Sequence, residues 1–115
     1  MGRRTLARIR HGLDLRNHYF ELDSLPTPLV GAPFETHQPL EVEVGSGKGL
    51  FMRSAAAERP THNFLGIEIA SSYAKYAAAQ LAEHGLSNAA IVRGDGMQFF
   101  GNRLSSGQLR TVHVY

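Results

Sequence analysis

The chain has 115 residues, 43% of them hydrophobic and none of them cysteine, and its formal net charge is +2. This length and composition suit one globular domain, exclude disulfides and thiolate metal sites, and agree with a reducing, cytoplasmic location. No apolar run approaches the roughly 20 residues of a membrane span and the six histidines lack zinc-type spacing, so neither a membrane nor a metal ion is expected as a partner.

Positive charge is concentrated near the N-terminus. Within the first 20 residues five basic side chains face one acid, Asp14, and they are Arg3, Arg4, Arg8, Arg10 and Arg16. Such an arm is a candidate nucleic-acid contact, although charge alone favours a solvated arm with no partner. Residues 1–38 show no clean helical or strand period and hold three prolines. They predict a basic arm and an irregular lead-in, with room for a short helix within 3–13.

A regular pattern begins after Pro39. Residues 40–44 (LEVEV) predict a strand, GSGKG follows it directly, and residues 50–58 predict a helix that ends before Pro60. Further elements continue the alternation: strands at 64–69, 89–92 and 110–115, a helix from Ser71 or Ser72 to about Gly85, and a short helix around 97–104.

Strands that alternate with helices predict an α/β fold with right-handed crossovers, a parallel sheet with helices on both faces, and the strand order 3-2-1-4. A ligand of such a sheet is expected beyond the carboxyl ends of the strands. The GSGKG segment, Glu68 and Asp95 each follow a predicted strand, so they are expected to converge there.

The glycine-rich segment is the first candidate binding element. Gly45 and Gly47 allow a sharp turn and close approach of a ligand to the backbone. A dinucleotide fingerprint is excluded because Leu50 holds its last glycine position, and a P-loop is excluded because Gly49 follows the lysine. The remaining pattern, acidic-x-Gly-x-Gly-x-Gly from Glu43, resembles the first motif of S-adenosylmethionine-dependent methyltransferases. An acid at that position suits the cationic ammonium of methionine. The alternative is an ordinary glycine-rich turn with a solvated glutamate.

Two further acids and one apolar residue complete the candidate site. Glu68 at the end of the second strand can accept hydrogen bonds from both ribose hydroxyls, and Ile69 beside it can cover an adenine ring. Asp95 can accept a hydrogen bond from the adenine amino group. Taken alone, Glu68 is read more simply as a surface residue and Asp95 as part of a turn.

The wording of several segments is more specific than these motifs. LEVEVGSGKGLFM, NFLGIEIASSYAKYAA, GLSNAAIVRGD and LRTVHVY resemble the bacterial tRNA (guanine-N7-)-methyltransferase family, over about residues 39–115. The resemblance implies a Rossmann-like class I methyltransferase fold, S-adenosyl-L-methionine as cofactor and tRNA as partner. It also implies donor contacts at Glu43, Glu68 and Asp95, with Gly45 and Gly47 shaping the turn. Together with Ile69, these residues are the predicted cofactor-binding site.

The chain departs from that family at its end, because the family continues from the VHVY strand into a Phe-Pro-Asp-Pro-Trp segment that serves the guanine. Catalytic residues are therefore expected beyond Tyr115. The sequence is interpreted as a basic lead-in (1–38) and a donor-binding half-domain (39–115), truncated after the fourth strand. Taken by itself, this piece is expected to be inactive and to self-associate through the exposed edge of that strand.

Three other functions stay open. One is a non-catalytic ligand-binding or RNA-binding module with the same fold. Another is a class I methyltransferase with a different substrate. A nicotinamide oxidoreductase is the third, and the residue at position 50 disfavours it.

Overall fold

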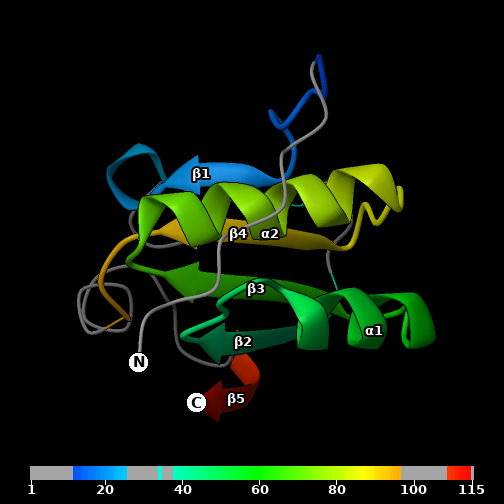
Figure 1. Cartoon of the computed structure of the whole chain (residues 1–115). Coiled ribbons are helices and arrows are strands. Elements are labelled where there is room, and N and C mark those ends of the chain that lie inside the picture. Colours follow the sequence, from blue (N-terminus) through cyan, green and yellow to red (C-terminus); the bar gives the residue numbers. More distant parts are fainter. Residues whose placement is uncertain (1–11, 26–33, 35–37, 97–108, 115) are drawn as a thin grey trace, which may run out of the picture.

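A computed structural model describes residues 12–25, 34, 38–96 and 109–114 of the chain. These residues form one sheet of five strands, all parallel, in the order β1-β4-β3-β2-β5 (Figure 1). In chain order the elements are β1 Tyr19–Glu21, the 3-10 helix η1 Leu22–Ser24, β2 Leu40–Val44, α1 Leu50–Glu58, β3 Asn63–Glu68, α2 Ser71–Glu83, β4 Ala89–Arg93 and β5 Leu109–Val114.

The predicted α/β fold is confirmed. The four predicted strands correspond to β2, β3, β4 and β5, and their order across the sheet is the predicted 3-2-1-4. Helix α1 has the predicted bounds, and α2 begins at Ser71 and ends just before Gly85, which takes a left-handed conformation with φ 63°. The short helices expected within 3–13 and around 97–104 lie outside the described residues.

The sequence predicted helices on both faces of the sheet, and one of these helices, around 97–104, lies outside the described residues. The two described α-helices, α1 and α2, cover one face (Figure 1). The reason is the direction of the crossovers. The chain moves from β2 to β3 and on to β4 in the same direction across the sheet, and right-handed crossovers in one direction lie on one face. Among the described residues, the opposite face is packed by Leu22 and Leu25 with Phe34 against them.

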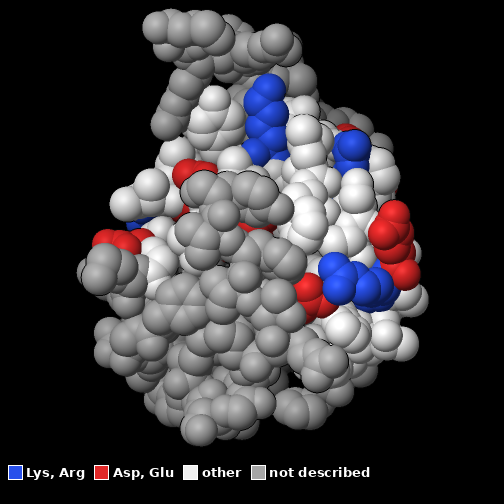
Figure 2. All heavy atoms as spheres, turned by 90° about the horizontal axis from the view of Figure 1, so that it is seen from below, with Lys and Arg blue, Asp and Glu red and all other residues white. Residues whose placement is uncertain are grey.

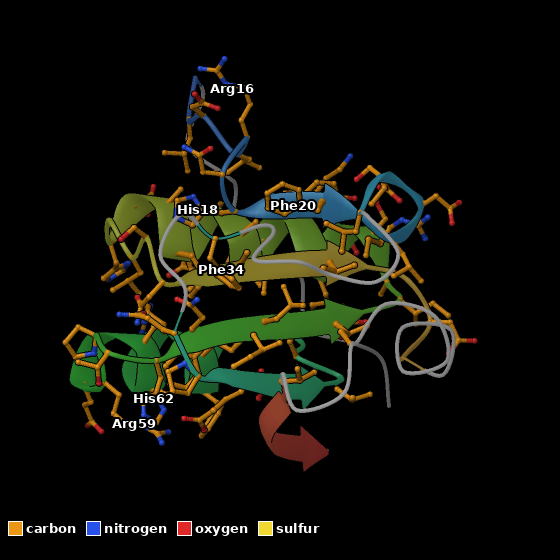
Figure 3. The ribbon with its side chains drawn as sticks, turned by 180° about the vertical axis from the view of Figure 1, so that it is seen from behind. Arg16, His18, Phe20, Phe34, Arg59 and His62 are labelled. Carbon is orange, nitrogen blue, oxygen red and sulfur yellow. The ribbon has the colours of Figure 1, made fainter. Side chains whose placement is uncertain are left out.

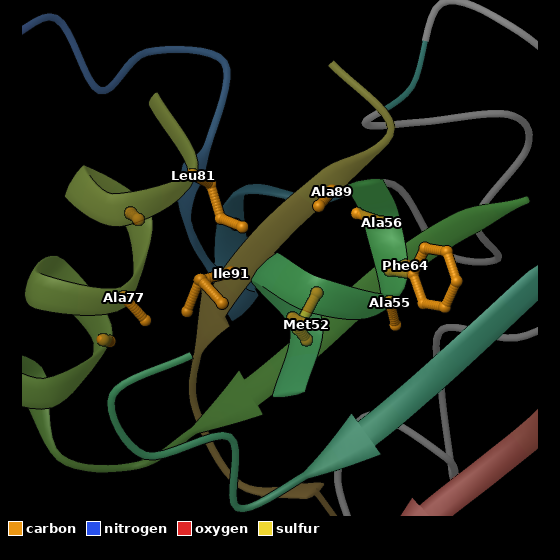
Figure 4. Packing of buried hydrophobic residues seen from close by; sticks show 10 residues of the cluster. Met52, Ala55, Ala56, Phe64, Ala77, Leu81, Ala89 and Ile91 are labelled. Carbon is orange, nitrogen blue, oxygen red and sulfur yellow. The ribbon is translucent and has the colours of Figure 1, made fainter. Parts of the chain in front are cut away.

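Small side chains hold the helices close to the sheet. The buried positions of α2 are mostly alanines, and α1 contributes Met52 beside Ala55 and Ala56. Figure 4 shows these residues around Phe64 and Ile91 of the strands. The packing is close, because a Cβ at Gly49 would lie 2.8 Å from the Cβ of Ala77. Helix α2 therefore lies against the end of the glycine turn, with no room for a side chain at position 49.

Strand β1 was not predicted, because its residues fall in the stretch expected to be irregular. Tyr19–Glu21 pairs in parallel with residues 91–93 of β4 and adds a fifth strand to the sheet. Three residues are too few to show a period in the sequence, and the strand forms because Phe20 and Tyr19 pack on the two faces of the core. The division of the chain after residue 38 stays a prediction.

Neither α1 nor α2, nor any other helix in the described ranges, is long and apolar enough to cross a membrane. In the same part of the chain, no three His, Cys, Asp or Glu side chains gather in a way that could hold a metal ion.

Candidate functional site

A pocket of about 180 Å³ opens at the carboxyl ends of β2, β3 and β4. It brings together four of the six predicted site residues, Gly45, Glu68, Ile69 and Asp95. Its other lining residues are Val44, Ile67, Gly94 and Gly96, so none of the described residues that line it is basic. This composition suits a ligand with hydroxyl, amino or cationic groups better than a phosphate.

The GSGKG segment forms the turn that the sequence predicted. Gly45, Gly47 and Gly49 all have positive φ angles, of 77°, 55° and 78°, which residues with a Cβ rarely adopt. The turn crosses the end of β3, since the N–H of Gly45 donates to the carbonyl oxygen of Ile67 at 2.8 Å. The glycines are therefore required by the backbone path between β2 and α1.

Glu68 holds the turn in place, a role that its position in the sequence did not reveal. Its Oε1 accepts a hydrogen bond from the N–H of Gly47 at 2.9 Å, and its Oε2 accepts one from the N–H of Ala70 at 2.9 Å. The carboxylate thus links the glycine turn to the start of α2. Each carboxylate oxygen has a second lone pair, so the group can still accept hydrogen bonds from a ligand.

Glu43 does not line the pocket, although it lies near Glu68. Its side chain is buried, with 4% exposure, and its Oε1 atom has no hydrogen-bond partner among the described residues. Burial, together with the negative charge of Glu68, raises the pKa of Glu43 to about 7. Ionising an unpaired buried carboxyl costs free energy, so this group favours the binding of a cation or of a hydrogen-bond donor beside it.

The same strand carries a second buried glutamate that serves as a comparison. Glu41 lies two residues earlier and therefore on the same face, and it is 2% exposed. Its Oε2 accepts a hydrogen bond from Arg59 at 2.9 Å and lies 2.7 Å from Nδ1 of His62. Figure 3 shows Arg59 and His62 together at the end of β2 away from the pocket. Glu41 is thus paired within the fold, whereas Oε1 of Glu43 has no hydrogen-bond partner in the ranges that the structure describes.

Asp95 lies between two glycines in the loop that follows β4, and we call residues 94–96 the acidic loop. The N–H of Gly94 donates to the carbonyl oxygen of Glu68 at 3.1 Å, which ties this loop to the end of β3. Asp95 is exposed on the pocket wall. On the same wall Ile69 is 67% exposed, so its apolar side chain is open to pack against a ring of a ligand.

Comparison with known proteins shows the family of the chain. Residues 37–115 match the family model described as "Putative methyltransferase". The chain belongs to this methyltransferase family, whose activity implies a methyl donor.

The most similar relatives include two enzymes with a defined substrate. The tRNA (guanine-N(7)-)-methyltransferase of Rhodopirellula baltica is 42% identical over 121 residues, which cover 100% of the chain and 45% of the relative. The enzyme of the same name from Levilactobacillus brevis is 39% identical over 85 residues, 71% of the chain and 40% of the relative. The chain thus spans less than half the length of these relatives. The crystal structure of the YcgJ protein from Bacillus subtilis covers 50% of the chain and 24% of its own, with 20% identity and a TM-score of 0.42.

Proposed function

We propose that this chain is the donor-binding portion of a tRNA (guanine-N7-)-methyltransferase that uses S-adenosyl-L-methionine. The observation that carries the proposal is the acidic pocket where the glycine turn, Glu68 and Asp95 meet. The identity of 42% to a relative of that name, over the whole chain, supports the choice of substrate.

The chain's own groups fit such a donor. Glu68 is suited to the ribose hydroxyls, Asp95 to the adenine amino group and Ile69 to the face of the adenine ring. Glu43 is suited to the ammonium group of the methionine part, which would supply the hydrogen-bond partner that Oε1 does not find among the described residues. Gly45 and Gly47 keep side chains out of the ligand's path.

The chemistry required of these residues is binding and orientation. The sulfonium group of the donor supplies the methyl group, and N7 of guanine attacks with an in-plane lone pair, so no proton has to leave first. The three acids therefore hold the donor and transfer no proton, and positioning can contribute several orders of magnitude in rate. The groups that bind the guanine are proposed to lie in the part of the relatives that this chain does not span.

Calorimetry with S-adenosylhomocysteine tests the donor site directly, with NAD as the control ligand. We expect binding of S-adenosylhomocysteine and none of NAD, and the reverse result would contradict the proposal. The product of the complete gene should then transfer a labelled methyl group to tRNA. Donor binding without transfer to any tRNA would point to a non-catalytic module or to another substrate.

The proposal that tRNA is the partner rests on similarity to the relatives and not on a positively charged surface of the described residues. Arg16 is the one arginine of the basic arm within the described residues, and its guanidinium pairs with Asp14 at 2.8 Å. On the face shown in Figure 2, the described Lys and Arg side chains stand in separate places, some beside acidic ones. A tRNA substrate would place the protein in the cytoplasm.

A polypeptide of these 115 residues should self-associate. Strand β5 is the outermost strand on its side of the described sheet, and its second row of backbone groups has no neighbouring strand there. Such an edge can pair with another copy of the chain. Light scattering over a concentration series should show dimers or larger species, and a monomer at high concentration would contradict this expectation.

A further inference from the structure

The strand that the sequence did not predict runs directly to the donor pocket. Strand β1 is in register with the last three residues of β4, and its final residue, Glu21, lies opposite Arg93. The chain then continues into η1 on one strand and into the acidic loop on the other. The N-terminal segment 19–24 and the pocket wall are therefore neighbours, although about 70 residues separate them in sequence.

Leu22, the first residue of η1, lies in contact with the backbone of the acidic loop. It is 5% exposed and belongs to the core cluster that includes Val92 of β4. A Cβ placed on Gly94 would lie 2.7 Å from the Cβ of Leu22 and 3.0 Å from its Cδ2. The nearer atom is fixed to the backbone of η1 and cannot swing aside, so Leu22 sets how far the loop extends in that direction.

On its other sides the acidic loop is held by the strands that form the pocket. Gly94 donates its N–H to Glu68, as described above, and a Cβ on Gly96 would lie 3.0 Å from Cγ1 of Val44. The loop is thus confined between Leu22 behind it and the ends of β2 and β3 in front. Removing the rear contact should free the loop without touching a residue that lines the pocket.

A polar clasp beside this contact fixes the same two strand ends. The Nε of Arg93 donates to Oε1 of Glu21 at 2.7 Å, and the hydroxyl of Tyr19 donates to Oε2 at 2.7 Å. Both hydrogen bonds lower the pKa of Glu21, so the carboxylate stays ionised at neutral pH. Since Arg93 immediately precedes Gly94, the clasp fixes the residue from which the loop departs.

We infer that Leu22 is a positioning residue for the donor site, and that it acts by seating the acidic loop so that Asp95 meets the donor. The inference rests on the proposed function and extends it to a segment outside residues 37–115, the part that matches the family model. Leu22 touches no donor atom in this role. Its contribution is the placement of Asp95 and of the neighbouring Gly94 and Gly96, which also line the pocket.

Size-exchange variants test this inference in the whole chain. Leu22→Ala leaves a space behind the loop, and Gly94→Ala forces the loop away from η1; each should weaken binding of S-adenosylhomocysteine by about tenfold, measured by calorimetry. In the double variant Leu22→Gly/Gly94→Ala the Cβ of residue 22 is removed as well, so the new methyl group on residue 94 no longer meets it. The affinity of this double variant should return to within about threefold of the original, because the two changes are coupled.

Two controls separate positioning from general stability. Leu25→Ala removes a side chain from the same core cluster, so it should lower the melting temperature like Leu22→Ala and leave the affinity unchanged. Glu21→Ala opens the clasp at a half-exposed position where folding should persist, and should weaken the affinity about threefold. Asp14→Ala, which removes another exposed carboxylate paired with an arginine, should have no effect on it.

Hydrogen exchange of residues 94–96 gives a readout that needs no ligand. Leu22→Ala should speed exchange in this loop, whereas Leu25→Ala should not. Equal exchange and equal affinity in these two variants would overturn the inference. Failure of the original protein to bind S-adenosylhomocysteine would instead refute the proposed function, and the exchange data would still decide whether Leu22 seats the loop.

Discussion

The variant Glu43→Gln should be more stable than the original protein at pH 8 and about equally stable at pH 4. The pKa of Glu43 is about 7 in the fold, against a reference value of 4.5. Between these values the folded state binds more protons than the unfolded state, so stability falls as pH rises through this window. The shift corresponds to about 3 kcal/mol at pH 8, where the group is ionised in both states. Glutamine keeps the shape and removes this cost.

Urea unfolding at several pH values between 4 and 8 measures this difference. Glu41→Gln is the matched control, because it makes the same change two residues away at a carboxylate that has Arg59 and His62 as partners. This control should lose stability at neutral pH, since it weakens a buried pair. A Glu43→Gln variant that is less stable than the original at pH 8 would show that Glu43 has a partner in the ligand-free protein.

The gain in stability at Glu43 should be accompanied by a loss of ligand binding. If the carboxylate binds the ammonium group of the donor, Glu43→Gln should lower the affinity for S-adenosylhomocysteine by about 10- to 100-fold at pH 8. This range corresponds to the loss of a hydrogen bond to a charged group. A gain in stability together with a loss of affinity is typical of a binding-site group that has a partner only when the ligand is bound. Unchanged affinity would remove Glu43 from the donor site.

The variant Glu68→Ala should lose affinity for S-adenosylhomocysteine by about 100-fold, because it removes an ionised acceptor of several hydrogen bonds. The N–H groups of Gly47 and Ala70 lose their partner in the same step, so the glycine turn is no longer linked to α2. We therefore also expect a loss of about 1–3 kcal/mol in the free energy of unfolding. Calorimetry and urea unfolding measure the two effects separately.

Glu68→Gln separates the two roles of this carboxylate. The amide keeps one oxygen for one of the two backbone N–H groups, so the turn should stay largely in place while the charge is lost. Its affinity should lie between those of the original protein and of Glu68→Ala. Glu58→Ala, at the exposed end of α1 and outside the pocket lining, should change neither quantity. Full affinity in Glu68→Ala would exclude this residue from the donor site.

The elements between residues 40 and 93 could be predicted from the sequence because their signals are local. Alternating β-branched residues indicated the strands, alanine-rich stretches indicated the helices, and the handedness of crossovers then gave the strand order. The carboxyl ends of parallel strands lie at one edge, so Gly45, Glu68 and Asp95 were expected to converge, and they line one pocket.

Only the tertiary structure distinguished residues that look alike in the sequence. In the strand LEVEV the two glutamates have the same spacing and the same face, and no local pattern separates them. Glu41 is paired because the fold brings Arg59 and His62, 18 and 21 residues later, to its carboxylate. No residue in the described part of the chain gives Oε1 of Glu43 a hydrogen-bond partner. The contact of Leu22 with Gly94 is likewise a product of the fold.

The sequence by itself determined which segments form the sheet and where its ligand edge lies, because periodicity and handedness are local properties. Which acid has a free atom, and what stands behind the acidic loop, depend on side chains that only folding brings together.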